Sequence, residues 1–454
     1  MDTIELRAAA ECLQRLHGRF ASCFRRRECQ EHSLGYLRGL LLAEGRKSVE
    51  PMALVFGGPS ENEPEIDQST VLAWQRFLTV SPWEAQAVQR EIQSVFKEEF
   101  VPAAGQWAIG TVGVIDGSGF VKRGSESVGV QRQWCGRLGK KENCQVGVFL
   151  VGATPAGNAL LDHQLYLPKA WAADAARRKK TRVPAEITFQ TKPQIAAALV
   201  ARSSVGFDWV TADEEYGRDG ALLDALEQGG QRYLVEVPCD TTVWAEKPMR
   251  QTPDELVWQV RQLAATLPAR AWETIKLREG AKGPLVFEFA RLRIWSVRHR
   301  RAGPPLWLLI RRSLERVPEV KYYLSNAEPE VLLEPMAQVT GVRWRVEEFF
   351  EDAKGQLGMA DYEARSWTSW HHHMSLVALA HLFVTQTRRD LRGKTPGLTL
   401  DMALRLLRSA LPRPQLSLED AESLVDYHLA RNRQATKSHR KKWLAKHAKL
   451  IPRK

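Results

Sequence analysis

Two aspartates in this 454-residue chain each follow a short run of mostly apolar residues. Asp116 comes after Val112-Gly113-Val114-Ile115 and before Gly117-Ser118-Gly119, and Asp213 comes after Asp208-Trp209-Val210-Thr211-Ala212. Such runs predict strands, and carboxylates at the ends of neighbouring strands repel unless a cation compensates. Mg²⁺ suits such an oxygen-rich site, and a pair of these ions clamps the attacking and leaving oxygens of a phosphodiester. The competing interpretation is that each aspartate forms a turn.

The segment from Arg343 to Lys354 predicts a helix that offers a third acid. Positions 343, 347, 351 and 354 are spaced i, i+4, i+8 and i+11, so they share one helical face, which carries Arg343, Glu347, Glu351 and Lys354. This face is either a solvated ladder of salt bridges or a site for a metal and phosphates. The spacing alone does not choose between Glu347 and Glu351 as the metal ligand.

The elements that position these residues begin with helices over residues 1 to about 105. One helix is predicted near Gln68 to Leu78, and a second is predicted to start at Pro82 and run toward Phe100, because Ser81 and Glu84 form a capping-box pattern around it. The pair is either a DNA-reading helix-turn-helix or part of a helical bundle.

From Ala108 on, the pattern predicts an α/β sheet of mixed direction. The order is three strands, helix, strand, helix, strand, which fits an antiparallel meander followed by parallel crossovers. The predicted strands are 109–115, 144–151, 159–167, 207–212 and 233–237, with helices near 193–201 and 221–227. After Pro238 a region rich in Trp and Arg predicts a β-rich insertion, with strand-like runs at 272–277, 285–297, 305–311 and 320–325. Helices are predicted again from Glu334.

The distribution of charge favours a polyanionic partner. Lys and Arg total 65 against 53 Asp and Glu, a net charge of +12. Ten basic residues and no acid lie between Arg431 and Lys454, which leaves 12 − 10 = +2 for the other 454 − 24 = 430 residues. We interpret this segment, with Arg440, Lys441 and Lys442 near its centre, as an arm that binds polyanions. A solvated tail that aids solubility is the alternative.

Other classes of protein are disfavoured. The first residues lack the pattern of a secretory signal, and the most apolar stretch, Met374 to Val384, is about half the length of a bilayer span, so we expect a cytoplasmic protein without a membrane role. The six cysteines have no zinc-site spacing and are interpreted as reduced thiols. His371, His372 and His373 are consecutive, and a helix would point them about 100° apart, which disfavours a shared metal ion.

These residues together resemble the DDE transposases of bacterial insertion sequences, specifically the insertion sequence 4 superfamily and its insertion sequence 701 relatives. The family signature is Tyr-x-x-Arg-x-x-x-Glu-x-x-x-x-x-x-Lys, which Arg343, Glu347 and Lys354 match, whereas Thr340 stands in the place of the tyrosine. The resemblance covers most of the chain, and its more specific segments are 115–124, 127–136, 212–217 and 370–373.

The resemblance implies an RNase-H-like mixed sheet core that is interrupted by a β-rich insertion and flanked by helical regions. The implied regions are a helical DNA-binding or dimerisation region at 1–105, the core at 106–238 and 331–395, the insertion at 239–330 and a helical basic region at 396–454. The separations of the acids agree with it. Asp213 follows Asp116 by 213 − 116 = 97 positions, and Glu347 follows Asp213 by 347 − 213 = 134 positions, which leaves room for an insertion.

The resemblance also implies metal-dependent cleavage of DNA at transposon ends, followed by attack of the released 3′ hydroxyl on target DNA. Asp116, Asp213 and Glu347 would hold two Mg²⁺ ions, for which Mn²⁺ can substitute. The DNA-binding residues would be Arg343, Lys354, Lys122 and Arg123, together with the basic arm. The implied partners are double-stranded terminal inverted repeats and target DNA, paired by a homodimer at the bacterial nucleoid.

Two other functions remain as alternatives. One is an RNase-H-like DNA nuclease that cuts without strand transfer. The other is a domesticated DNA-binding regulator derived from a transposase, which the presence of all three acids disfavours.

Overall fold

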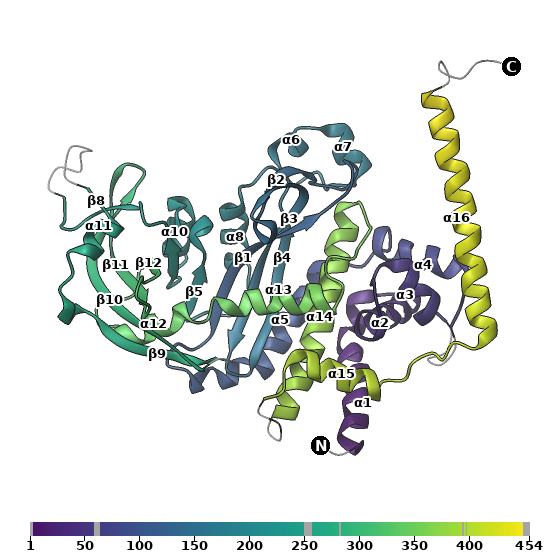
Figure 1. The fold of residues 1–454 in the computed structure, drawn as a ribbon, viewed down its shortest axis with the longest axis horizontal. Helices are drawn as coiled ribbons and strands as arrows, with labels where there is room; N and C mark the ends of the chain where they lie inside the picture. The colour runs from purple at the N-terminus through teal and green to yellow at the C-terminus, as the bar shows by residue number, and fades with distance from the viewer. Residues whose placement is uncertain are drawn as a thin grey trace. The chain divides into compact units, whose positions relative to one another are not determined.

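The computed structural model describes residues 3–58, 64–248, 257–280, 283–392, 395 and 397–447 (Figure 1). The chain divides into two compact units. The first consists of Met1–Trp83, Asp361–Glu363 and Leu404–Lys454, and the second of Glu84–Ala360 and Ala364–Ala403.

The first unit is helical in its described part. Its helices are α1 (Thr3–Phe20), η1 (Ala21–Phe24), α2 (Arg27–Leu42), α3 (Val49–Phe56), α4 (Gln68–Thr79), α15 (Leu400–Ala410) from Leu404 on, and α16 (Leu418–Lys446). Aromatic side chains fill its core, where the rings of Tyr36 and Trp74 lie 5.4 Å apart between centroids. The helix expected near Gln68 is confirmed as α4, which begins where the Asp67 side chain accepts a hydrogen bond from the Ser69 amide.

The next helix begins three residues later than the sequence indicates. α5 runs from Ala85 to Glu99, and Glu84 is its N-cap instead of the expected Ser81. Trp83 explains the delay, because its side chain is buried and its indole Nε1 donates a 3.0 Å hydrogen bond to the Phe77 carbonyl, which fixes the backbone before the helix. α4 belongs to the first unit and α5 to the second, and the choice between a helix-turn-helix and a helical bundle stays a prediction.

The described part of the second unit contains two sheets and the helices that pack on them. The first sheet contains β1 (Val112–Val121), β2 (Gln131–Cys135), β3 (Lys140–Thr154), β4 (Gly157–Leu165) and β5 (Trp209–Ala212). Its order is β2-β3-β1-β5, and β4 also pairs with β3. Because β1 is antiparallel to β3 and parallel to β5, the expected mixed direction is confirmed.

Helices cover both faces of the first sheet. On one face α8 (Lys192–Ala201) and α10 (Gly220–Gln228) bury a continuous apolar cluster with β1, β3 and β5. On the other face, Phe350 of α13 (Trp344–Gln356) and Trp370 of α14 (Trp367–Arg392) pack around Phe149 of β3, with ring centroids 5.2 and 6.2 Å away. The remaining helices of this unit are α5, η2 (Val101–Gln106), η3 (Gly136–Leu138), α6 (Lys169–Ala172), α7 (Ala175–Lys180), α9 (Glu214–Gly217), α11 (Val260–Ala265), η4 (Ala269–Ala271) and α12 (Leu333–Thr340).

The second sheet alternates apolar and polar residues along its strands. It contains β6 (Leu234–Val237), β7 (Thr242–Trp244), β8 (Trp258–Gln259), β9 (Glu273–Gly280), β10 (Gly283–Arg298), β11 (Arg301–Ser313) and β12 (Val320–Ser325), in the order β6-β12-β11-β10-β7-β8, with β9 beside β10. Residues such as Leu308 and Ile310 form a core with α11. The intervening residues, such as Arg311, point to the opposite face. α12 lies against this second sheet. α13 follows α12 in the chain and packs on the first sheet (Figure 1).

The mixed α/β class with additional helices is confirmed, and the four strand runs expected after Trp272 correspond to β9, β10, β11 and β12. The strand expected at 233–237 differs in its partner. As β6 it pairs with β12 of the second sheet and is linked to β5 by the bridge between Val210 and Tyr233. Among the described residues, every helix is too short or too polar to span a bilayer.

Candidate active site

Asp116 and Asp213 lie side by side on neighbouring parallel strands. Ile115 of β1 and Ala212 of β5 are partners in the parallel register, so the next residue along each strand is one of these aspartates. Asp213 is the N-cap of α9, and its Oδ1 accepts a 3.0 Å hydrogen bond from the Glu215 amide. The fold therefore brings together two acids that are 97 residues apart in the sequence, 213 − 116.

Asp116 does not end its strand, contrary to expectation. β1 continues through it to Val121 and stays paired with β3 over this whole length. The Gly-Ser-Gly segment that follows Asp116 is a stretch of strand that other side chains approach closely. A Cβ added at Gly117 would lie 3.2 Å from the Tyr216 hydroxyl, and one added at Gly119 would lie 2.8 Å from Sγ of Cys135.

The two aspartates are electrostatically strained. Burial, and then the negative charge of Asp213, hold the pKa of Asp116 well above the ordinary carboxyl value. Burial, and then the charge of Glu215, raise the pKa of Asp213 as well. Two desolvated carboxylates on neighbouring strands therefore need a positive charge beside them if both are to be ionised.

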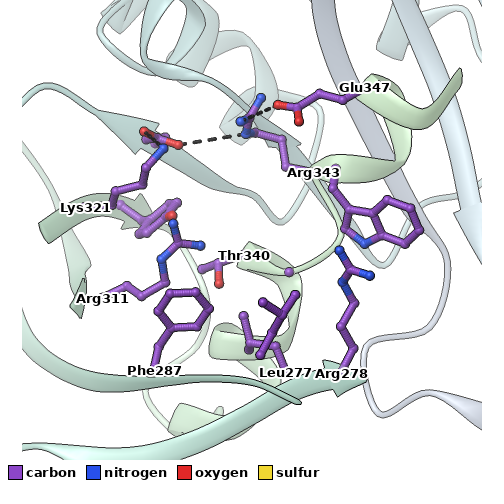
Figure 2. A pocket seen from close by; sticks show the side chains of 13 residues that line it. Leu277, Arg278, Phe287, Arg311, Lys321, Thr340, Arg343 and Glu347 are labelled. Carbon is purple, nitrogen blue, oxygen red and sulfur yellow. Dashed lines mark hydrogen bonds and ion pairs between the residues drawn. The ribbon is translucent and has the colours of Figure 1, made fainter. Parts of the chain in front are cut away.

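Arg343, which precedes α13, supplies part of that charge. Its Nη2 lies 2.7 Å from Oε1 of Glu347, its Nη1 4.0 Å from Oδ2 of Asp116, and its Nε 3.8 Å from Oε2 of Glu236. Figure 2 shows its side chain reaching toward Glu347. Burial alone would lower the pKa of Arg343, but the surrounding carboxylates raise it above its usual value, which keeps this guanidinium charged.

The structure distinguishes Glu347 from Glu351, which the helical spacing alone could not do. The charge of Glu347 contributes to the raised pKa of Asp116, whereas the charge of Glu351 acts on Asp352. Glu347 is therefore the acid of α13 that lies nearer to the aspartates. Its side chain is 55% exposed and paired with Arg343, so it is not packed against Asp116.

The expected cluster of three acids is present as a close pair plus one acid held by Arg343. Among the described residues, no group of three His, Cys, Asp or Glu side chains is arranged to hold a metal ion. Two features nevertheless fit a hard cation. The aspartate pair is desolvated, and the hydroxyl of buried Tyr216, close to Gly117, has no hydrogen-bond partner in the described part of the chain. Oxygen ligands of this kind suit Mg²⁺ or Mn²⁺.

Lys354 reaches the same strand from the far end of α13. Its Nζ donates a 2.6 Å hydrogen bond to Oγ of Ser118 and lies 5.1 Å from the centre of the Phe120 ring. Burial, and then the charge of Arg137, lower the pKa of Lys354 to about 8. Ser118 and Glu236 were not identified from the sequence, because their partners are set by the packing of α13 on β1 and by the pairing of β6 with β12.

The other predicted DNA-binding residues lie in two places. Lys122 and Arg123 directly follow β1, Lys122 half-buried and Arg123 exposed. Arg440, Lys441 and Lys442 are exposed on α16 in the first unit. Of the basic arm, Lys449, Arg453 and Lys454 lie outside the described residues.

Thr340 occupies the position of the signature tyrosine. It is buried at the end of α12, where its Oγ1 donates a 2.6 Å hydrogen bond to the Ala337 carbonyl. It also lines a pocket of about 140 Å³ that opens beside Arg343 and Glu347 (Figure 2). The space next to this position is thus bordered by cationic side chains of the second sheet, Arg311 and Lys321 among them.

Two families of known proteins match parts of this chain. A family described as DDE superfamily endonuclease matches residues 19–284, and one described as transposase DDE domain matches residues 190–383. The chain is also similar to the probable transposase for insertion sequence element IS701 of Microchaete diplosiphon. The two are 27% identical over 295 residues, which cover 63% of this chain and 67% of that relative.

Proposed function

Because the chain belongs to the DDE superfamily of endonucleases, we propose that it is a transposase that cuts DNA at the ends of its own element and joins the released 3′ hydroxyl to target DNA. The observation that carries this proposal is the parallel register of β1 and β5, since it sets Asp116 beside Asp213. The proposed reaction is cut-and-paste transposition, in which hydrolysis at the transposon end is followed by a transesterification that joins the end to target DNA.

We also propose that the first sheet with its covering helices is an RNase-H-like core. The mixed strand directions around β1 support this assignment. The second sheet is then an insertion, supported by its position in the sequence between β5 and α13, although β6 extends it by one strand toward the N-terminus. The core regions remain 106–238 and 331–395, the insertion 239–330, and the flanking helical regions 1–105 and 396–454.

In this function Asp116, Asp213 and Glu347 are the catalytic acids and the ligands for two divalent cations, Mg²⁺ or Mn²⁺. When bound, such ions stabilise the charge that develops on the attacking and leaving oxygens. The raised pKa values of the aspartates support this role, since a cation relieves their repulsion. Glu347 is the most exposed of the three proposed ligands, and its side chain is paired with Arg343.

Arg343 and Lys354 bind phosphate oxygens of the strand being cut. The guanidinium offers several N–H donors in one plane, and the ammonium acts as a point charge, so the two residues orient the backbone differently. They lie at opposite ends of α13, and each is close to β1: Arg343 through Asp116 and Lys354 through Ser118.

DNA beyond the cleaved bond is bound by Lys122 and Arg123 and by the exposed basic half of α16, with Arg440, Lys441 and Lys442. These positions carry positive charge without carboxylate neighbours in the sequence, which supports phosphate contacts that do not depend on base sequence. A homodimer that pairs two terminal inverted repeats completes the proposal, and such an enzyme acts at the bacterial nucleoid.

The test uses the full-length protein and DNA that carries the inverted repeat flanking its coding sequence, supplied intact or already cut to leave a free 3′ hydroxyl. With Mg²⁺ we expect nicking of the intact end and covalent joining of the pre-cut end to a target plasmid. Nicking without joining would favour the nuclease alternative, and binding without either reaction would favour the regulator.

A further inference from the structure

Beside Glu347, the pocket of about 140 Å³ gathers cations from four elements. Arg278 comes from β9, Arg311 from β11, Lys321 from β12, and Arg343 from the start of α13. We propose, resting on the function above, that this pocket is a second phosphate-binding subsite, which holds a backbone phosphate of the DNA strand next to the bond that is cut. None of the three residues from the second sheet belongs to the signature on α13.

Arg311 and Lys321 are direct partners across the antiparallel pair of β11 and β12. Like charges in this arrangement repel and destabilise a sheet unless an anion lies near them. Lys321 has such an anion, because its Nζ is 2.9 Å from Oε1 of Glu236. For Arg311, no carboxylate or other hydrogen-bond acceptor serves as a partner among the residues that the structure describes.

Aromatic rings hold Arg311 in place instead. Its guanidinium carbon lies 4.6 Å from the centre of the Phe287 ring and 5.9 Å from that of Tyr323. Stacking against a ring fixes the plane of a guanidinium but leaves the N–H donors along its edge unused. Figure 2 shows this group inside the pocket, next to Lys321.

Arg278 repeats this arrangement on the opposite wall. Its guanidinium carbon lies 4.0 Å from the centre of the Trp344 ring, and within the described ranges it has no ion-pair partner. Two guanidinium groups with fixed planes and free donors therefore line the same space. A phosphodiester supplies what they lack, namely a negative charge and several acceptor oxygens in one compact group.

Arg312, the neighbour of Arg311 on β11, shows that this is not a general property of the sheet. It points to the opposite face, where it stacks on Trp272 at 3.8 Å and its Nε pairs with Oε2 of Glu288 at 2.7 Å. Its Nε donor is thus paired with a carboxylate of the protein, unlike the donors of Arg311 in the described part of the chain. The volume of the pocket also matters, because about 140 Å³ is below the roughly 300 Å³ of the smallest common ligand sites and suits a small anion.

The experiment compares Arg311→Gln and the double variant Arg311→Gln, Lys321→Gln with the wild type and with the matched control Arg312→Gln. The probe is the duplex that carries the flanking inverted repeat, and its affinity is measured over a series of salt concentrations. Removing one cation that binds a phosphate lowers the slope of log affinity against log salt by about 0.9. Because both Arg311 variants lose the contact to the same single phosphate, we expect this one decrease for each of them, and an unchanged slope for Arg312→Gln.

A second measurement changes the DNA instead of the protein and begins with the wild type. Each linkage near the cleavage point is replaced in turn by a neutral methylphosphonate, and binding to the wild type is measured. We expect one linkage beside the cut bond to lose affinity on neutralisation, and Arg311→Gln to be insensitive at that linkage. Equal slopes for wild type and Arg311→Gln, or equal sensitivity at every linkage, would overturn the subsite. If the wild type itself fails to cut this DNA, the proposed function fails instead.

Discussion

Lys354 donates a 2.6 Å hydrogen bond to the hydroxyl of Ser118, two residues beyond Asp116 on the same strand. This interaction fixes an ammonium group beside the aspartate pair and buries it, and burial lowers its pKa to about 8. A lysine in this state carries its charge below that pH and loses it above, whereas an arginine would stay charged throughout.

DNA binding should therefore weaken as the pH rises through about 8. Lys354 stops attracting its phosphate when it becomes neutral. The slope of log affinity against log salt should therefore be smaller in magnitude by about 0.9 at roughly one pH unit above the pKa of Lys354 than at one unit below it. The Lys354→Arg variant should keep the same slope at both values. A wild-type slope that does not change across this interval would show that Lys354 does not bind phosphate.

The Asp116→Asn variant should be inactive and yet more stable than the wild type. The pKa of Asp116 is raised on folding, so the folded state binds a proton more tightly than the unfolded state, and stability falls as the pH rises through that pKa. Removing the charge should raise the free energy of unfolding at neutral pH by about 1–3 kcal/mol. Thermal unfolding without divalent ions measures this, and the difference should vanish in acid.

Mg²⁺ should raise the unfolding temperature of the wild type but not that of Asp116→Asn, since a ligand stabilises only the protein that binds it. A variant that is less stable than the wild type at neutral pH would contradict the repulsion inferred between Asp116 and Asp213. Equal stabilisation of both proteins by Mg²⁺ would place the ion elsewhere.

Glu347→Gln and Glu351→Gln form a matched pair on one face of α13. We expect Glu347→Gln to lower the rate of end cleavage by on the order of 10²-fold or more, because it removes a charged group at the reacting centre. Glu351→Gln should cleave at the wild-type rate, since its charge acts on Asp352 and not on the aspartate pair. Single-turnover cleavage assays separate these outcomes, and equal losses would refute the assignment of Glu347.

Neutralising the basic centre of α16 should weaken binding to all DNA sequences alike. The triple variant of Arg440, Lys441 and Lys442 to Gln removes up to three cations that bind phosphates, so its salt slope should fall by about 0.9 for each phosphate released. Affinity for the inverted repeat and for unrelated DNA should decrease by the same factor. A selective decrease for the inverted repeat would mean that this helix reads sequence.

Much of the fold could be predicted because it is encoded locally. The β-branched runs of β5 and β9 to β12 match the strands within a few residues, and so do α4, α8 and α10. Errors arose where a distant contact overrode a local signal. Ser81 and Glu84 are a good capping pattern, but burial of Trp83 delays α5. Asp116 was expected at a strand end, but pairing with β3 continues β1 past it to Val121.

The candidate site could be proposed from the sequence as a set of residues but not as an arrangement. Spacing put Arg343 and Glu347 on one helical face, and their 2.7 Å ion pair agrees with it. No local pattern could indicate that Arg343 also approaches Glu236, because that contact depends on β6 leaving the first sheet for the second. The same holds for Arg311, whose stacking on Phe287 needs β10 and β11 side by side.

The distance along the chain between β1 and α13 has a consequence during synthesis. Glu347 is made 347 − 116 = 231 residues after Asp116, and the strands of both sheets precede it in the chain. A polypeptide whose translation stops before α13 therefore contains both aspartates but lacks Glu347. If the three acids act together as we propose, such a polypeptide cannot cut DNA.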